Sequence, residues 1–161
     1  MKNRITDAKC VVIKIGSALL VDKKTGTIHQ KWFQSVIDDI THYWKQGQQV
    51  VIVSSGAIAL GRHHLQLKNN MLHLEEKQAA AAVGQIKLAY FYQEALAKHN
   101  ITVAQILLTL EDSENRKRYL NARNTLKTLL NFPPNHALGI VGAASVHAYQ
   151  AGPKFMFALI G

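Results

Sequence analysis

The amino-acid sequence predicts an α/β fold, with a mainly parallel sheet and helices on both of its faces. Continuous apolar runs occur at residues 10–15, 49–54 and 101–108, and strands that are buried on both faces have this pattern. Between these runs, apolar residues recur at helical spacing. Strands and helices that alternate in this way indicate parallel strands joined by helical crossovers. We expect these three strands to be neighbours in the sheet.

The first predicted strand, CVVIKIG at 10–16, is rich in β-branched residues and ends at a glycine. We expect a loop at 17–30, because this segment contains two lysines and a glycine. A helix is predicted at 30–46, where the apolar residues line one helix face. These residues are Phe33, Val36, Ile37, Ile40 and Trp44. Gly47 is expected to end this helix.

The alanine-rich segment at 75–100 predicts a long helix, with acidic residues at its start and basic residues at its end. Gly84 lies inside it and costs about 1 kcal/mol relative to alanine, which indicates close packing or a functional approach. A further helix is predicted at 113–131, with Ser113 as its N-cap. The apolar segment ALGIVGAASV at 137–146 can add a fourth strand.

The chain has 161 residues, the size of one domain. Its residues are 48% hydrophobic and 18% charged, which is typical of a folded core rather than of disorder. No apolar run approaches the roughly 20 residues that span a bilayer, and the N-terminal sequence MKNRITDAKC has no apolar signal segment. We therefore expect a cytoplasmic protein with no membrane partner.

The formal net charge of +9 makes nucleic acid a first hypothesis for the partner. However, the basic residues are spread along the chain, and aromatics do not interleave with the one cluster, RKR at 116–118. We therefore expect small anions, not nucleic acid. The histidines, including the adjacent His63 and His64, show no metal-ligand spacing, so no metal site is predicted. Cys10, the single cysteine, is expected to be a buried and unreactive thiol.

Polar turns follow the first two predicted strands. Gly16 and Ser17 come after the first strand, and SSGA at 54–57 comes after the second. Parallel α/β sheets bind ligands at the carboxyl ends of their strands, where N–H groups and hydroxyls can hold a carboxylate or phosphate. The alternatives are a plain tight turn and an ordinary helix N-cap. The motifs G-x-x-x-x-G-K-[ST], G-x-G-x-x-G and G-x-S-x-G do not occur.

Lys14 interrupts the β-branched run of the first strand. A buried, unpaired ammonium is expensive, so the side chain must have a partner or face a cleft. At the ligand end of the sheet, it can neutralise a phosphoryl group during transfer. The alternative is an edge-strand lysine that extends into water.

Four segments, in this order, resemble the glutamate 5-kinases of the amino acid kinase family. They are VVIKIGSALL, VVIVSSGAIALGR, KQAAAAVGQ, and ILLT followed by RKRYLNARNTLKTLL. The resemblance runs from about residue 9 to residue 131. It implies a three-layer αβα sandwich, and it implies phosphorylation of the γ-carboxylate of L-glutamate by ATP with Mg²⁺, the first step of proline biosynthesis.

The resemblance also implies roles for the residues of the first turn. Lys14 would contact the ATP phosphates and stabilise the transferred group. Gly16 and Ser17 would line the path of the phosphoryl group. The family further suggests a homo-oligomer.

For the second turn, the resemblance implies a substrate site. Ser55, with Gly56 and Ala57 beside it, would bind L-glutamate next to the phosphoryl group. The segment YLNARNTL lies against the substrate region in the family, but we assign it no catalytic role.

The resemblance stops after residue 131. There the family continues into an Asn-Glu-Asn-Asp motif and a Gly-Asp-Asn-Asp segment, and neither occurs here. We therefore expect residues 1–131 to be the N-terminal, substrate-binding part of a kinase domain and residues 132–161 to be a divergent tail, as a frameshift or truncated reading frame gives. The 161-residue chain is expected to be inactive. The alternative function is a non-catalytic α/β remnant that binds at most an anion or glutamate.

Overall fold

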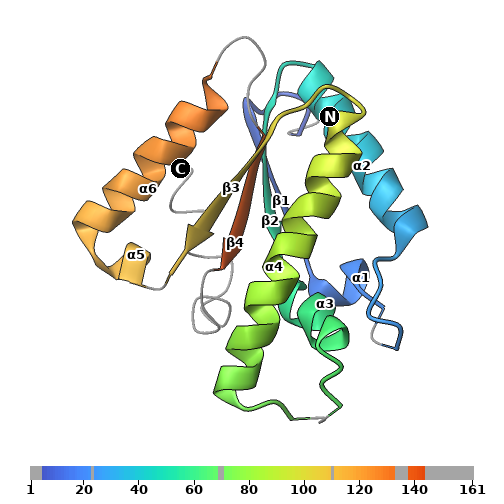
Figure 1. Ribbon diagram of the computed structural model, residues 1–161. Helices are drawn as coiled ribbons and strands as arrows, with labels where there is room; N and C mark the ends of the chain where they lie inside the picture. The colour runs from blue at the N-terminus through green and yellow to red at the C-terminus, as the bar shows by residue number, and fades with distance from the viewer. Residues whose placement is uncertain (1–4, 23, 69–70, 110, 133–137, 144–161) are drawn as a thin grey trace.

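The computed structural model describes residues 5–22, 24–68, 71–109, 111–132 and 138–143 (Figure 1). Its centre is a four-stranded parallel sheet in the order β1-β2-β4-β3. The strands are β1 (Cys10–Ile15), β2 (Gln49–Ser54), β3 (Val103–Leu108) and β4 (Leu138–Ala143). The predicted α/β class with a parallel sheet is confirmed.

Helices cover both faces of this sheet (Figure 1). They are α1 (Ser17–Leu20), α2 (Gln30–Lys45), α3 (Ala57–His64), α4 (Leu74–Ala97), α5 (Glu111–Glu114) and α6 (Arg116–Leu130). In Figure 1, α2 and α4 lie on one side of the sheet and α6 lies on the other. The helices predicted at 30–46 and 75–100 are confirmed as α2 and α4.

The strand order corrects one expectation. We expected the first three strands to be neighbours, but β4 lies between β2 and β3. It pairs with β2 from Val51 to Val53 and with all six residues of β3. The predicted fourth strand therefore exists, and it occupies the interior of the sheet rather than an edge. Apolar runs identify strands but do not determine their order.

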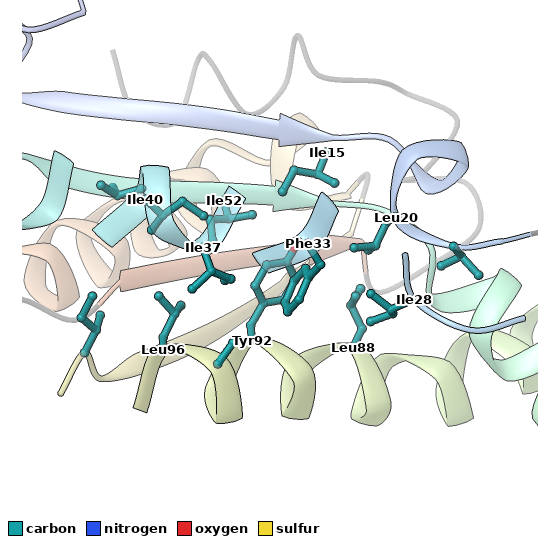
Figure 2. Packing of buried hydrophobic residues seen from close by; sticks show 14 of the residues in the cluster. Ile15, Leu20, Ile28, Phe33, Ile37, Ile40, Ile52, Leu88, Tyr92 and Leu96 are labelled. Atoms are coloured by element: carbon teal, nitrogen blue, oxygen red, sulfur yellow. The ribbon is translucent and has the colours of Figure 1, made fainter. Parts of the chain in front are cut away.

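The larger core lies between the sheet and the helices α2 and α4 (Figure 2). Strands β1 and β2 contribute Ile15 and Ile52, and the helices contribute Phe33, Ile37, Ile40, Leu88, Tyr92 and Leu96. The rings of Phe33 and Tyr92 meet edge to face, with centroids 5.2 Å apart. This contact joins α2 to α4 above the sheet.

A smaller core lies on the α6 face and is formed by Val51, Leu108, Leu126 and Leu130. At its margin, the Gln49 amide donates to the Leu130 carbonyl (3.2 Å) and to the Asn131 side-chain oxygen (2.9 Å). Cys10 packs here and is half-buried, and burial raises the pKa of its thiol. A raised pKa leaves a smaller fraction of reactive thiolate, in the direction we expected, but the thiol is half-buried rather than buried.

The segment predicted as a loop at 17–30 contains the helix α1 and an antiparallel bridge between Val21 and Ile28. Its apolar residues Leu20, Val21 and Ile28 are buried in the larger core. The loop prediction was therefore wrong in part. Lys24 and Gly26 lie in the turn at its tip, while the three apolar side chains anchor the segment.

Two predicted helix ends have different outcomes. Gly47 follows α2 with φ of +82°, and the N–H of Gln48 donates to the Tyr43 carbonyl (3.3 Å), which is a Schellman C-cap. The predicted N-cap Ser113 is wrong, because Ser113 lies within α5. Instead, the Asn115 side chain accepts from two N–H groups of the first turn of α6.

Candidate functional site

The turns after β1 and β2 are joined through Ile15, the last residue of β1. Both the N–H and the hydroxyl of Ser55 donate to the Ile15 carbonyl oxygen, at 3.0 and 2.9 Å. Gly16 follows Ile15 directly, so the two turns that the sequence analysis selected lie side by side. A hydroxyl oxygen that donates its proton in this way retains lone pairs that can accept a hydrogen bond.

The neighbouring serine, Ser54, has a different environment. It is 8% exposed and points into the larger core, where its Oγ lies 3.0 Å from the hydroxyl of Tyr92. Tyr92 is fully buried, and burial raises its pKa to about 12, although the hydrogen bond with Ser54 acts in the opposite direction. Ser54 is therefore a core residue, and Ser55 is the serine of the turn.

Gly56 gives the second turn its shape. It adopts φ of +118°, a left-handed conformation that favours glycine. It is the N-cap of α3, and a Cβ here would lie 3.3 Å from a methyl group of Val21. The first N–H groups of α3, from Ala57 onward, have no acceptor within the helix and carry the positive end of its dipole. The turn can thus hold a carboxylate or phosphate oxygen.

The position of α3 is fixed by two glycines. A Cβ added to Gly61 would overlap the carbonyl oxygen of Ala80 on α4, and one added to Gly84 would overlap that of Ala57 on α3. The two helices therefore cross with their backbones in contact. This confirms close packing as the role of Gly84. It also locates the N-terminus of α3 relative to the core.

Lys14 is exposed and opposes Val53 in the pairing of β1 with β2. Its neighbours Ile13 and Ile15 pack in the larger core, and side chains alternate along a strand, so Lys14 projects toward the α6 face. Strand β1 is an edge of the described sheet. Because Lys14 is exposed, its ammonium does not need a charged partner. Its role in neutralising a phosphoryl group at the ligand end of the sheet stays a prediction.

An open pocket of about 1270 Å³ lies beside the two turns. Ser17 and Gly56 line it, together with residues of α3, the turn after β1 and the segment between α3 and α4. Its charged and titratable lining residues are Asp22, Lys24, Arg62, His63, His64, Lys68 and Lys77. Because four of these are lysine or arginine and one is acidic, the pocket favours anions.

This basic cluster could not be predicted from the sequence, because its members are spread over more than fifty positions and only the fold brings them together. Part of the arrangement is fixed by hydrogen bonds. The Asp22 carboxylate accepts from the N–H groups of Thr25 and Lys24, which lower its pKa. Arg62 donates from Nε to the Leu67 carbonyl (3.2 Å).

At the carboxyl end of β3, charged residues form a second polar cluster. The Asp112 carboxylate accepts from the N–H and the hydroxyl of Thr109 and from Arg118, which also pairs with Glu111. Burial raises the pKa of Asp112, but these hydrogen bonds outweigh it, and the net pKa is lowered. The cluster fastens α5 and the start of α6 to the end of the strand.

Two features are absent from the part of the chain that the structure describes. No group of three or more His, Cys, Asp or Glu side chains in this part of the chain is arranged to hold a metal ion. No helix among the described residues is long and apolar enough to cross a membrane.

Comparison with known proteins shows the family. The model of the amino acid kinase family matches residues 9–142, which extends beyond residue 131 into β4. The chain is 59% identical over 126 residues to a glutamate 5-kinase of Ruegeria sp. (strain TM1040), a match that covers 78% of this chain and 34% of that protein.

Two further relatives give the same result. The identity is 59% over 123 residues with a glutamate 5-kinase of Paramagnetospirillum magneticum (76% of this chain, 33% of the relative). It is 57% over 119 residues with one of Rhodospirillum rubrum (74% and 32%). The chain thus spans about a third of the length of the curated relatives it matches. It belongs to the amino acid kinase family.

Proposed function

We propose that this chain is the substrate-binding part of a glutamate 5-kinase, which transfers the γ-phosphoryl group of ATP to the γ-carboxylate of L-glutamate. The observation that carries the proposal is the pair of hydrogen bonds from Ser55 to the Ile15 carbonyl. These bonds hold the turn assigned to glutamate against the turn assigned to the phosphoryl group. The identity with proteins named glutamate 5-kinase supports the choice of substrate.

In the proposed reaction, a γ-carboxylate oxygen attacks the terminal phosphorus of ATP, and the bond from that phosphorus to ADP breaks. Positioning and charge neutralisation account for most of the catalysis in such transfers. Ser55, Gly56 and Ala57 would bind glutamate through the hydroxyl and the N–H groups at the start of α3. Lys14 would neutralise the transferred group, whose path Gly16 and Ser17 would line.

Mg²⁺ is expected to accompany ATP in this reaction, since phosphate oxygens are its usual ligands. The described residues do not fit a protein site for it, because they contain no cluster of carboxylates or histidines that could hold a metal. We therefore assign no residue and no step to the metal. The basic pocket would act earlier, since its positive charge raises the local concentration of anionic substrates.

A chimera tests the proposal. Residues 9–131 of this chain would replace the matching segment of a full-length relative, and ADP release would be measured with and without L-glutamate. We expect glutamate-dependent turnover that Lys14→Ala abolishes or strongly reduces. Lys45→Ala, an exposed site in the last turn of α2, is the matched control and should leave turnover unchanged. A folded chimera without turnover would contradict the proposal.

For the 161-residue polypeptide alone, we propose binding without turnover. In-line transfer needs both substrates to be fixed at once, and the chain spans about a third of its relatives. The basic pocket supports the alternative function for this polypeptide, which is the binding of an anion without catalysis. ADP release that depends on glutamate and is lost in Lys14→Ala would overturn this part of the proposal.

We extend the proposal to a cytoplasmic homo-oligomer. The support for an oligomer is on the outer face of α4, where Ile86 and Tyr90 are 75% and 58% exposed, one helical turn apart. Sedimentation analysis of wild type and Ile86→Lys tests it. A wild-type monomer at all concentrations would contradict it.

A further inference from the structure

The hydroxyls of Tyr92 and Ser54 form a hydrogen-bonded chain that ends on the second turn. Ser54 Oγ lies 3.0 Å from the Tyr92 hydroxyl and donates to the Ser55 carbonyl oxygen at 3.4 Å. A serine hydroxyl has one proton. Either hydroxyl can be the donor between Tyr92 and Ser54, and in the arrangement in which Ser54 gives its proton to the Ser55 carbonyl, Tyr92 is the donor to Ser54. The chain therefore runs from α4 through Ser54 to the peptide bond between Ser55 and Gly56.

This chain determines the direction of that peptide. Tyr92 lies on α4, so Ser54 Oγ and the Ser55 carbonyl that it contacts lie on the α4 side of the sheet. A trans peptide points its C=O and N–H in opposite directions, so the Gly56 N–H is directed away from α4. Lys14 also projects away from α4, because its neighbours Ile13 and Ile15 pack on the α4 side and side chains alternate along a strand.

We propose that Tyr92 is a positioning residue for the proposed phosphoryl transfer. Acting through Ser54, its buried hydroxyl directs the Gly56 N–H toward the face that carries Lys14, where that N–H would bind an oxygen of the glutamate γ-carboxylate. The inference rests on the proposed function. The same peptide is also held by the left-handed φ of Gly56 and by the hydrogen bonds from Ser55 to the Ile15 carbonyl.

Single and double variants of Tyr92 and Ser54 distinguish a positioning role from a contribution to stability alone. Removing one partner of a buried hydrogen bond leaves the other unsatisfied and destabilises the protein. Replacing both partners by apolar groups of similar shape can be nearly neutral. The double variant Tyr92→Phe/Ser54→Ala should therefore recover much of the stability that either single variant loses. It still lacks the chain to the Ser55 carbonyl.

The experiment measures stability, order of the turn and ligand binding on the same variants of the 161-residue chain. Urea denaturation gives the free energy of unfolding, ¹⁵N relaxation gives the order parameter of the Gly56 N–H, and titration with L-glutamate gives the affinity. Tyr90→Phe is the matched control, because Tyr90 lies on the same helix and is exposed.

In wild type and in Tyr90→Phe, we expect the Gly56 order parameter to be near the rigid value of about 0.85. In Tyr92→Phe and in the double variant it should fall toward the flexible range below about 0.6, and glutamate affinity should fall about fivefold. A double variant with wild-type order at Gly56, or with wild-type affinity, overturns the proposal. If wild type itself shows no glutamate binding, the proposed function fails, and the order parameter still decides whether Tyr92 directs the Gly56 peptide.

Discussion

Gly61 of α3 and Gly84 of α4 face one another where the two helices cross, and neither site has room for a Cβ. The added atom at Gly84 would overlap the Ala57 carbonyl oxygen, at the first residue of α3. The close crossing thus sets the position of the helix N-terminus to which we assign the substrate carboxylate. Fold stability and site geometry depend on the same two residues.

Gly84→Ala should destabilise the protein by about 1–3 kcal/mol, because overpacking forces the helices apart. This sign is opposite to helix propensity, which favours alanine by about 1 kcal/mol. The control is Ala82→Gly at an exposed position of the same helix, which should cost about 1 kcal/mol through propensity alone. Urea denaturation of both variants measures the two changes in the free energy of unfolding. A Gly84→Ala variant that is more stable than wild type would show that the helices do not cross tightly.

Lys14→Ala should lower kcat more than it changes KM for glutamate in the chimera that carries residues 9–131. The reason is that a cation acting on the transferred phosphoryl group stabilises the transition state more than the bound substrate. Steady-state kinetics with varied glutamate at saturating ATP measure both constants. An effect confined to KM would assign Lys14 to substrate binding instead.

Asn115→Ala should destabilise the protein by about 1 kcal/mol, because the Asn115 side chain caps two N–H groups of α6. Ser113→Ala is the matched control, since sequence reasoning favoured that residue as the cap. Thermal or urea unfolding of the two variants distinguishes them. Equal losses of unfolding free energy in the two variants would mean that the Asn115 side chain does not stabilise α6 as a cap.

Asp112→Asn should flatten the acid dependence of stability. Hydrogen bonds from Thr109 and Arg118 outweigh the effect of burial, so the folded-state pKa of Asp112 lies below its usual value of 3.8. Such a group stabilises the folded state above the unfolded-state pKa, and this contribution is lost as the pH falls through the folded-state pKa. The free energy of unfolding, measured between pH 7 and pH 2, should fall less steeply in the variant than in wild type.

Glu114→Gln, an exposed change in the same short helix, is the control for this measurement. It should leave the acid dependence close to that of wild type. If Asp112→Asn and wild type lose stability in parallel below pH 4, the carboxylate hydrogen bonds do not contribute to stability.

Local patterns predicted much of the fold, because hydrophobic periodicity is a property of each segment. The helix α2 followed from one apolar face, and Gly47 followed from the C-cap that glycine favours. The place of β4 between β2 and β3 could not be predicted in this way, since it depends on pairing between segments far apart in the chain. The burial of Leu20 and Ile28 was missed because the nearby lysines dominated the pattern of that segment.

The site shows the same division. The turns that contain Gly16, Ser55 and Gly56 were predicted because polar residues directly follow apolar strands, and the structure places these turns side by side. Their roles stay predictions. The basic pocket was missed, since Lys24, Arg62 and the other cations meet only in the folded chain. The hydrogen bond between Tyr92 and Ser54 was likewise invisible, because a tyrosine within an apolar helix face gives no sign of the partner its hydroxyl will find.

The central claim is that the turn formed by Ser55, Gly56 and Ala57 binds L-glutamate beside Gly16 and Ser17. A titration of the ¹⁵N-labelled 161-residue chain with L-glutamate, followed by amide chemical shifts, tests it most directly. L-Glutamine, which lacks the γ-carboxylate, is the control ligand.

We predict saturable shifts of the amides of Gly56, Ala57 and Ser17 with L-glutamate, and weaker or no shifts there with L-glutamine. The contrary result would be no saturable shift, or saturable shifts confined to residues remote from the turn, such as Asn124 and Thr128 on the outer part of α6. Either outcome would contradict the assignment of this turn to the substrate.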